Sequence, residues 1–332
     1  MDELMRPRIF ITQPVASTAI ERLADVAEVN LNCDPMRIMD NDALCAAAAN
    51  NDILFCLLHD KVDHKVIAAN PRLRAIASMK ITPSDIDVSA ATARHIPVTV
   101  IPAMVTEATA DINWALLLAV ARRVVEGDRL VRQGIFPGAQ SSYLEAAMVY
   151  GKTIGLVGGG GRIGRAVARR ARGFGMRALY WGPRRLPEAD EQESGLSYVG
   201  LDQLLAEADF VSLHSPLRPE TVHQIGAREL GLMKPTAFLI NTSRGGIVDE
   251  AALVAALAGR RIAGAGLDVF ENEPQPTPAL LKLPNTVLTP HLGSAVTALR
   301  ESMAHVVVDN ILAILKDQRP PNCWNTEIYA TV

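Results

Sequence analysis

Three ionisable residues in the second half of the chain each follow a short apolar run. Arg244 comes after residues 237–241, Glu273 after 263–269, and His291 after 286–289. Open parallel α/β sheets bind ligands at the carboxyl ends of their strands, so we expect these side chains at one edge of a sheet. The planar fork of an arginine suits bidentate recognition of a carboxylate beside a reacting carbonyl. A histidine transfers protons near neutral pH, and a nearby carboxylate fixes its tautomer and favours the imidazolium.

Each of these three residues also has an ordinary structural interpretation. Arg244 could cap a helix, Glu273 could be a solvated loop carboxylate, and His291 could be a satisfied core histidine. For any single residue the ordinary interpretation is the better one. All three at strand ends, downstream of a nucleotide-binding pattern, are harder to explain by chance, which favours a catalytic set. Because no residues show metal-ligand spacing, the sequence predicts no metal site.

A glycine-rich segment upstream supplies the nucleotide-binding pattern. Residues 153–157 form an apolar run typical of a buried strand, residues 158–164 turn the chain, and residues 165–171 have helical spacing. Glycines let the backbone approach a pyrophosphate, and the helix N-terminus offers unpaired N–H groups and a positive dipole end. The cofactor contacts expected here are Gly159, Gly161, Arg162, Ile163 and Gly164.

Two alternatives remain for this segment. The turn has one glycine more than the usual spacing, so Gly158 could take the place of Gly159. The glycines could also serve only the close packing of a helix on a strand.

The composition is that of an ordinary globular protein. The chain has 332 residues, 49% of them apolar, and a formal net charge of −3. This length exceeds what one core usually supports and predicts two domains. The charge balance gives no reason to expect a nucleic-acid partner, and no apolar run is long enough to span a membrane. The first residues lack a signal-peptide pattern, and the four cysteines show neither metal-type nor redox-type spacing; together they predict a cytoplasmic protein.

Short apolar runs alternate with helical stretches along most of the chain, which is the pattern of parallel sheets covered by helices. We therefore expect an α/β fold of two doubly wound parallel-sheet domains. Strands are predicted at residues 8–12, 52–56, 73–78, 97–100, 153–157, 177–181, 210–214, 237–241, 263–269 and 286–289.

Two long helices are predicted to connect these domains. One begins at Thr106, a plausible N-cap, and runs to about Glu126; the other spans about residues 294–316. If these helices are the crossings, a dinucleotide-binding domain of residues 102–297 is inserted into a domain made of residues 1–101 and 298–332.

From about Arg72 to Lys316 the chain resembles the D-2-hydroxyacid dehydrogenases, which include glyoxylate/hydroxypyruvate reductases and phosphoglycerate dehydrogenases. The matching segments are residues 106–111, 151–153 with the glycine turn, 241–245, 267–274 and 290–294. The resemblance implies a Rossmann-type nucleotide domain inserted into a flavodoxin-like substrate (catalytic) domain. It also implies a homodimer built on the nucleotide domains.

The same resemblance implies roles for individual residues. Arg244 would orient the carboxylate and carbonyl of the substrate, and Glu273 would support His291. His291 would protonate the carbonyl oxygen as hydride arrives from the nicotinamide, so that a small 2-keto acid of the glyoxylate or hydroxypyruvate type becomes the D-2-hydroxy acid. Asp268 resembles the carboxylate that holds the nicotinamide amide. The remaining cofactor contacts implied are Thr106, Thr242, Ser243 and Gly293.

The end of the second strand of the nucleotide domain departs from the pattern for NAD. That strand usually ends in an acid that hydrogen-bonds the adenosine ribose, whereas here Gly182 stands at the position and Arg184 and Arg185 follow. Without the carboxylate a 2′-phosphate is not repelled, and an arginine can pair with it. We therefore expect NADP(H) to be preferred, with NAD(H) still usable. The alternative is that both arginines are solvated loop charges and the enzyme does not discriminate.

A second departure lies in the loop that in relatives presents backbone N–H groups to the substrate carboxylate. Residues 78–84 read Ser-Met-Lys-Ile-Thr-Pro-Ser, without the usual glycine and with a proline that has no N–H. We expect Lys80, Ile81 and Thr82 to contact a small anionic substrate. Lys80 could instead be a surface charge.

Two other functions compete with keto-acid reduction. Lys80, together with the His-Leu-Gly-Ser-Ala-Val stretch at residues 291–296, also resembles phosphite dehydrogenase, so a phosphite-type reaction is one alternative. The other is a non-catalytic scaffold that senses NAD(H), because some transcriptional corepressors resemble this fold and keep the same three residues.

Overall fold

The computed structural model describes residues 6–330 and divides the chain into two compact units. The terminal unit comprises the residues up to Met104 and those from Ala295 onward, and the central unit comprises Val105–Ser294. The chain passes between them just before two long helices, whereas the sequence placed the crossings in the helices themselves. Residues 1–5, where the sequence lacks a signal-peptide pattern, and residues 331–332 lie outside the described part.

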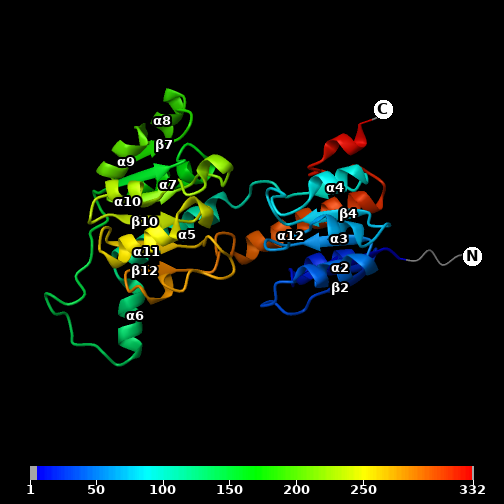
Figure 1. Ribbon diagram of the computed structural model, residues 1–332, viewed down its shortest axis with the longest axis horizontal. Helices are drawn as coiled ribbons and strands as arrows, with labels where there is room; N and C mark the ends of the chain where they lie inside the picture. The colour runs from blue at the N-terminus through cyan, green and yellow to red at the C-terminus, as the bar shows by residue number, and fades with distance from the viewer. Residues whose placement is uncertain (1–5, 331–332) are drawn as a thin grey trace, which may run out of the picture. The chain divides into compact units, whose positions relative to one another are not determined.

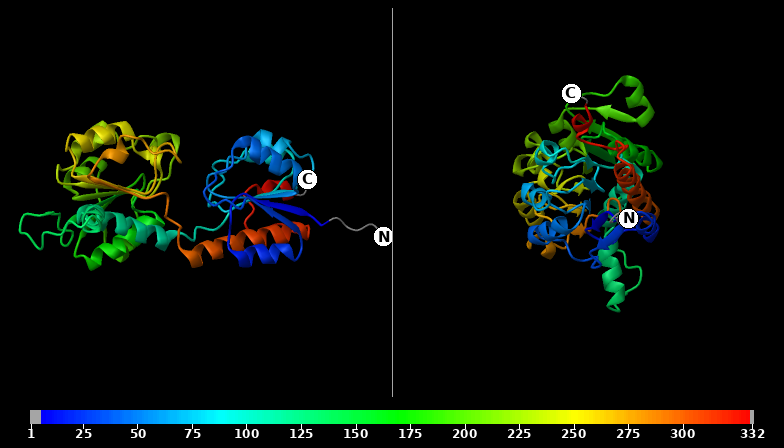
Figure 2. Two further views of the ribbon diagram at one scale, coloured as in Figure 1. Left: turned by 90° about the horizontal axis from the view of Figure 1, so that it is seen from below. Right: turned by 90° about the vertical axis from the view of Figure 1, so that its right-hand side faces the viewer.

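Within the described residues, the terminal unit has a five-stranded parallel sheet in the order β2-β1-β3-β4-β5, which is the flavodoxin-like order. The strands are β1 Arg8–Ile11, β2 Glu28–Leu31, β3 Ile53–Cys56, β4 Ala75–Ser78 and β5 Val98–Thr99. The helices are α1 Ser17–Ala24, α2 Asn41–Asn50, α3 His64–Ala68, α4 Val88–Ala93 and α12 Thr297–Leu315. Helices α1 and α12 cover one face and α2, α3 and α4 the other (Figures 1 and 2). The doubly wound arrangement expected for this part of the chain is confirmed.

The central unit has a seven-stranded parallel sheet among its described residues, in the order β12-β11-β10-β9-β6-β7-β8. Numbered from β6, this is the Rossmann order 3-2-1-4-5-6 with one more strand at the edge. The strands are β6 Thr153–Val157, β7 Arg177–Trp181, β8 Leu196–Tyr198, β9 Phe210–Leu213, β10 Phe238–Asn241, β11 Gly264–Leu267 and β12 Thr286–Leu288. The helices are α5 Thr106–Ala121, α6 Val124–Arg132, α7 Arg162–Gly173, α8 Glu188–Ser194, α9 Leu201–Glu207, α10 Ala227–Leu232 and α11 Glu250–Ala258.

Two apolar cores stabilise the central sheet, one on each face. Helices α5 and α7 bury one core against β6, β7, β9 and β10, and α9, α10 and α11 bury the other. Apolar burial of this kind is the main driving force that holds the layers together. Within residues 6–330, no helix combines the length and the apolar character needed to cross a membrane.

The two long helices begin and end differently from the prediction. α5 ends at Ala121, because Arg123 has a left-handed φ of 54° that interrupts the helix before α6 begins. Thr106 is the first helical residue and not the N-cap, a position that Val105 occupies. The final helix, α12, begins at Thr297 and not near residue 294.

Candidate active site and nucleotide cradle

The turn between β6 and α7 approaches its neighbours so closely that only glycine fits at three positions. Gly158 has a φ of +77°, and a Cβ there would lie 2.6 Å from the backbone nitrogen of Ser215. A Cβ on Gly159 would lie 2.5 Å from Leu156 Cβ, and one on Gly164 would lie 2.4 Å from the carbonyl oxygen of Gly159. The glycines therefore let the start of α7 pack directly on the end of β6.

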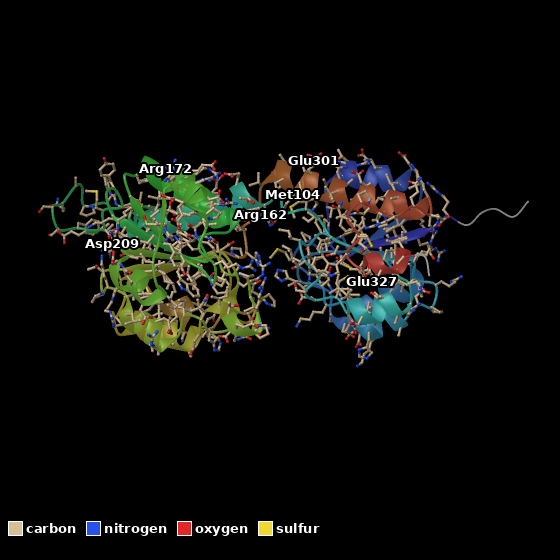
Figure 3. The ribbon with its side chains drawn as sticks, turned by 90° about the horizontal axis from the view of Figure 1, so that it is seen from above. Met104, Arg162, Arg172, Asp209, Glu301 and Glu327 are labelled. Atoms are coloured by element: carbon tan, nitrogen blue, oxygen red, sulfur yellow. The ribbon has the colours of Figure 1, made fainter. Side chains whose placement is uncertain are left out.

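The second half of the turn leaves room for a ligand. The nearest atom to a Cβ on Gly161 would be the Gly158 carbonyl oxygen at 3.5 Å. Gly161 is the N-cap of α7 and has no side chain that could accept from the first N–H groups of the helix. Arg162 and Ile163 are the first two helical residues and carry two of these N–H groups. Figure 3 shows Arg162 at one end of this helix and Arg172 near the other. Unpaired N–H groups at a helix N-terminus attract anions, so these residues fit the pyrophosphate of a dinucleotide.

The loop after β7 is held by a cluster that the sequence did not reveal. The Tyr180 hydroxyl donates to Glu191 Oε1 at 2.7 Å and accepts from the Leu186 N–H at 2.7 Å. Arg185 donates to both oxygens of Glu191, at 2.9 and 2.8 Å. Arg184 is exposed, and among the described residues it has no ion pair. Arg185 is therefore a loop charge that is ion-paired, although 63% of its side chain is exposed.

The charges of this cluster are fixed by its hydrogen bonds. Donation from Arg185 and from Tyr180 lowers the pKa of Glu191 to about 2. Burial, followed by the hydrogen bond to Glu191, raises the pKa of Tyr180 to about 12. The cluster therefore holds a carboxylate, a guanidinium and a neutral phenol at any ordinary pH.

The turn after β10 presents Arg244. Asn241 Oδ1 accepts from the backbone N–H and the hydroxyl of Ser243, at 3.0 and 2.8 Å, and Asn241 Nδ2 donates to the Arg244 carbonyl at 3.0 Å. The Arg244 side chain is exposed, and its Nη1 donates to the Ser243 carbonyl at 2.7 Å. The buried asparagine thus fixes the backbone from which the guanidinium projects, a role that the sequence did not indicate.

Asp268, at the end of β11, organises the loop that carries His291. Its carboxylate accepts from the Thr289 hydroxyl at 2.6 Å, the Leu292 N–H at 2.7 Å and the Gly293 N–H at 2.8 Å. The His291 N–H donates to the Asp268 carbonyl at 2.9 Å. Burial raises the pKa of Asp268, while the hydrogen bonds from Thr289 and from the loop N–H groups act in the opposite direction. This structural task accompanies the nicotinamide contact expected from the sequence.

His291 and Glu273 form a hydrogen-bonded pair. His291 Nδ1 lies 2.8 Å from Glu273 Oε2, and Glu273 Oε1 accepts from the Phe270 N–H at 3.1 Å. Because an ionised carboxylate can only accept, Nδ1 is the ring nitrogen that donates to Glu273. The side chains are 24% and 20% exposed, so His291 is not a core histidine and Glu273 is not a solvated loop carboxylate.

Thr242, a cofactor contact expected from the sequence, belongs to a buried polar chain. Asn113 Nδ2 donates to the Ser212 hydroxyl at 2.7 Å and to the Thr242 hydroxyl at 3.2 Å, and His214 Nε2 lies 3.0 Å from the Ser212 hydroxyl. Burial lowers the pKa of His214 to about 4, so the ring is neutral. An asparagine within the apolar helix α5 was the one signal in the sequence that could have revealed this chain.

The loop after β4 in the terminal unit gives a different result for Lys80. Its side chain is buried, and its ammonium donates to Asp85 Oδ2 at 2.7 Å and to the Asp60 carbonyl at 3.2 Å. The interpretation of Lys80 as a surface charge is therefore wrong. The backbone N–H groups of Ile81 and Thr82 have no hydrogen-bond partner among the residues that the structure describes.

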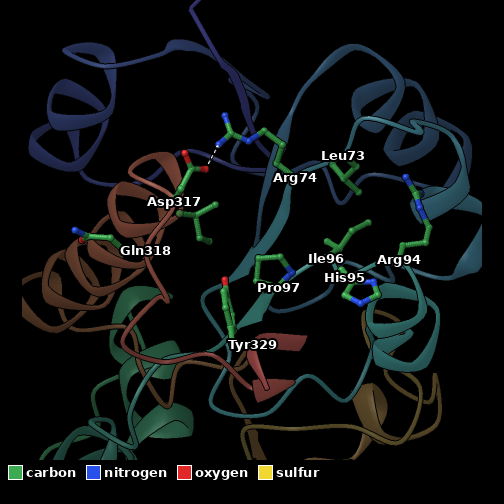
Figure 4. Close-up of a pocket in the computed structure, with 10 residues that line it drawn as sticks. Leu73, Arg74, Arg94, His95, Ile96, Pro97, Asp317, Gln318 and Tyr329 are labelled. Atoms are coloured by element: carbon green, nitrogen blue, oxygen red, sulfur yellow. Dashed lines mark hydrogen bonds and ion pairs between the residues drawn. The ribbon is translucent and has the colours of Figure 1, made fainter. Parts of the chain in front are cut away.

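A hollow of about 290 Å³ lies in the terminal unit at the amino ends of β4 and β5 (Figure 4). Two arginines line it, but Arg74 pairs with Asp317 at 3.3 Å and Arg94 donates to the carbonyls of Ile67 and Asn70. Because open parallel α/β sheets bind ligands at the carboxyl ends of their strands, a hollow at the amino ends is not a candidate active site.

Comparison with known proteins agrees with the fold. The family described as "D-isomer specific 2-hydroxyacid dehydrogenase, NAD binding domain" matches residues 114–293. A glyoxylate reductase from Thermococcus litoralis is 45% identical over 331 residues, which cover 98% of this chain and 99% of the relative. The crystal structure of the TT0316 protein from Thermus thermophilus has a TM-score of 0.86 and 41% identity, over 95% of this chain and 99% of that one.

The name of a further solved structure states which cofactor that protein uses. It is an NADPH-dependent glyoxylate/hydroxypyruvate reductase from Sinorhizobium meliloti, with a TM-score of 0.77 and 33% identity over 96% of this chain and 98% of that one. A Rossmann sheet with a glycine cradle, a histidine–carboxylate pair at its ligand-binding edge, and similarity along nearly the whole chain lead to one conclusion. The chain belongs to the D-isomer specific 2-hydroxyacid dehydrogenase family and is an enzyme that uses a nicotinamide cofactor.

Proposed function

We propose that this enzyme reduces small 2-keto acids of the glyoxylate and hydroxypyruvate type with NADPH and forms the D-2-hydroxy acid. The observation that carries the proposal is the 2.8 Å hydrogen bond between Glu273 and His291 at the ligand-binding edge of the Rossmann sheet. Support comes from the glyoxylate reductase of Thermococcus litoralis and from the glyoxylate/hydroxypyruvate reductase of Sinorhizobium meliloti.

The chemistry divides between the cofactor and three side chains. When bound, the reduced nicotinamide supplies the hydride that the keto carbon accepts. His291 donates its Nε2 proton to the carbonyl oxygen, so that no alkoxide has to form. Glu273 holds the Nδ1–H and stabilises the positive charge of the ring before the proton leaves. Arg244 offers a planar pair of N–H donors to the substrate carboxylate and thereby aligns the carbonyl.

NADPH is proposed as the better cofactor for two reasons. No carboxylate stands at Gly182, and the guanidinium of Arg184 is exposed in the same loop. The pyrophosphate would lie on the N–H groups of the glycine cradle. The other proposed cofactor contacts are Thr106, Gly159, Gly161, Arg162, Ile163, Gly164, Thr242, Ser243, Asp268 and Gly293.

The phosphite-type alternative depended on Lys80. In the structure the ammonium of Lys80 is bound by Asp85 and by a backbone carbonyl, which weakens the case for its pairing with a dianionic substrate. The unpartnered N–H groups of Ile81 and Thr82 suit a small carboxylate instead. Because scaffolds of this fold keep the same three residues, the Glu273–His291 pair does not separate the two functions, and the similarity to glyoxylate reductases is what favours an enzyme.

Turnover assays test this function. We expect NADPH to be oxidised with glyoxylate and hydroxypyruvate, and NADP+ not to be reduced with phosphite.

Replacement of His291 by Gln should lower kcat by about a hundredfold or more, because a general acid contributes on that order, and should leave the Kd for NADPH unchanged. Arg244→Lys should mainly raise KM for the keto acid, because a point charge cannot reproduce the planar fork. Wild-type kcat in His291→Gln would contradict the proposed mechanism.

We also propose that the enzyme is a homodimer located in the cytoplasm. Residues 124–150, here called the arm, carry exposed apolar side chains at Val124, Val131, Phe136 and Met148. Exposed apolar patches of this kind mark interaction surfaces, and a second copy of the chain is the occupant that the family resemblance favours.

The four cysteines are free thiols, as expected in a reducing compartment such as the cytoplasm.

A further inference from the structure

Two glutamates that take no part in the proposed chemistry bind each other's main chain. Glu250 is the first residue of α11, and Glu271 lies in the loop that carries Glu273. The Glu271 N–H donates to Glu250 Oε1 at 2.6 Å, and the Glu250 N–H donates to Glu271 Oε2 at 3.4 Å. This reciprocal arrangement, here called the glutamate clasp, joins the N-terminus of α11 to the loop after β11.

Each glutamate of the clasp also has a further hydrogen-bond partner. The second carboxylate oxygen of Glu250 accepts from the hydroxyl of Thr277. Glu271 Oε1 lies 2.6 Å from His223 Nε2, and the His223 N–H donates to the Gly246 carbonyl at 2.9 Å. The network therefore reaches from the loop that carries Glu273 to the loop that follows Arg244.

The backbones of these two loops touch where the network joins them. A Cβ on Gly245 would lie 1.9 Å from the carbonyl carbon and oxygen of Phe270, so no other residue fits. Phe270 in turn donates its N–H to Glu273 at 3.1 Å. A movement of the loop after β11 would therefore displace Glu273 and press on the residue next to Arg244.

Both carboxylates lie where their charge is favoured. The first N–H groups of a helix have no partners within the helix, and its positive dipole end stabilises an anion. Glu250 is only 3% exposed, so its carboxylate depends on the Glu271 N–H and the Thr277 hydroxyl. Loss of one acceptor there leaves a buried donor unsatisfied and loosens the loop.

We propose that Glu250 and Glu271 are positioning residues that lock the loops carrying Arg244 and Glu273 in one fixed register. Their task is to hold Glu273 on His291 while Arg244 projects from the adjoining turn. This inference rests on the proposed function, because it assumes that Glu273 and His291 are the proton-transfer pair.

The test is Glu250→Gln in the full-length enzyme. Glu250→Gln removes the negative charge at the N-terminus of α11 and turns one of the two acceptor oxygens into a donor, so the hydrogen bond with the Thr277 hydroxyl has to reverse its direction. A small misplacement of catalytic groups lowers rates strongly, so kcat/KM for glyoxylate should fall between about ten- and a hundredfold. The Kd for NADPH, measured by fluorescence, should stay unchanged.

The pH profile of kcat/KM distinguishes a positioning role from a loss of stability. A carboxylate beside an imidazole favours its protonated form, and reduction needs that form. If Glu250→Gln moves Glu273 away from His291, the alkaline limb of the profile should shift to lower pH. Glu273→Gln should shift the same limb further.

Glu229→Gln is the matched control. Glu229 accepts from the Gly226 N–H at 3.1 Å at the start of α10, as Glu250 does from Glu271 near α11, but it lies in neither catalytic loop. This variant should keep the wild-type rate and pH profile. If Glu250→Gln does not fold, Glu271→Gln replaces it, because the Glu271 side chain is 30% exposed and its substitution leaves Glu250 intact.

The outcomes separate the two proposals. A shifted limb in Glu273→Gln together with a wild-type profile in both clasp variants would overturn the positioning role and leave the function standing. No change of rate or limb in Glu273→Gln would overturn the proposed proton-transfer pair and the clasp with it, whereas the function itself fails only if glyoxylate and hydroxypyruvate are not reduced. Equal changes in Glu229→Gln and Glu250→Gln would show a general loss of stability and also reject the clasp.

Discussion

At the scale of single residues, one glutamate separates two arginines that the sequence treats alike. Arg185 donates two hydrogen bonds to Glu191, whereas Arg184 has no ion pair among the residues that the structure describes; both side chains are exposed. We expect Arg184→Ala to lower kcat/KM with NADPH by about tenfold or more, because a hydrogen bond to a charged group contributes about 1.5–3 kcal/mol. The value with NADH should not change.

Arg185→Ala is the matched comparison for this prediction. It should change the ratio of kcat/KM for NADPH and NADH much less than Arg184→Ala does, and should instead lower stability. A larger effect on that ratio from Arg185→Ala than from Arg184→Ala would mean that the phosphate displaces Glu191 from Arg185.

A second prediction at the residue scale concerns how the stabilising effect of ionised Glu191 depends on pH. Its pKa is lowered from 4.5 to about 2 in the folded protein, so it stabilises the fold fully above pH 4.5 and progressively less as the pH falls toward 2. Glu191→Gln should therefore lower the urea midpoint at pH 7, and the difference from wild type should shrink at pH 3. Glu188→Gln, an exposed change in the same helix, serves as the control. If the difference in urea midpoint between wild type and Glu191→Gln were the same at pH 7 and pH 3, the lowered pKa of Glu191 would be contradicted.

At the scale of elements, the junction of β6 and α7 depends on glycines of unequal importance. A Cβ on Gly164 would meet the Gly159 carbonyl at 2.4 Å, whereas one on Gly160 would come no closer than 3.4 Å to the Leu186 side chain. Gly164→Ala should destabilise the enzyme by about 1–3 kcal/mol through overpacking and should weaken NADPH binding. Gly160→Ala should be nearly neutral in denaturant unfolding without cofactor. Equal unfolding midpoints for the two variants would show that the turn is not as tight as described.

The elements that sequence patterns missed are the short ones at sheet edges. β2 reads Glu-Val-Asn-Leu with every other residue exposed, and β8 has only three residues. A buried strand leaves a continuous apolar run in the sequence, but an edge strand has a half-solvated face and leaves a weaker signal. The end of α5 was missed for another reason, because no glycine or proline marks the left-handed turn at Arg123.

At the scale of the whole molecule, the exposed apolar side chains of the arm lead us to predict a dimer. Phe136 and Met148 are 78% and 65% exposed, and every residue of α6 is at least partly exposed. Figures 1 and 2 show the arm extending away from the rest of the central unit. Phe136→Glu combined with Met148→Glu should convert a dimer into a monomer in analytical ultracentrifugation, because a charge in an apolar interface is unfavourable. Met36→Glu, which changes an 89% exposed methionine of the terminal unit, should leave the dimer intact. A wild-type enzyme that sediments as a monomer would reject the proposal directly.

The sequence by itself determined the parallel α/β fold, the glycine turn and the three candidate catalytic residues. Each of these features is encoded in a short stretch of sequence. The spacing of apolar residues indicates the strands and helices, and a residue just after a parallel strand must lie at the edge of the sheet where ligands bind. Arg244, Glu273 and His291 are therefore recognisable as a set from their positions after predicted strands, although none of them is recognisable alone.

Only the tertiary structure decided what each polar side chain binds. Glu191 takes Arg185 and leaves Arg184 exposed, Asp85 and a carbonyl of Asp60 hold a buried Lys80, and Glu250 and Glu271 bind each other across 21 positions of chain. A charged residue looks the same in a sequence whether it is solvated or paired. Burial of a charge is tolerated only where the fold supplies a partner, and the backbone conformation decides which side chains meet, whether they stand five positions apart, as Lys80 and Asp85 do, or 21 positions apart, as Glu250 and Glu271 do.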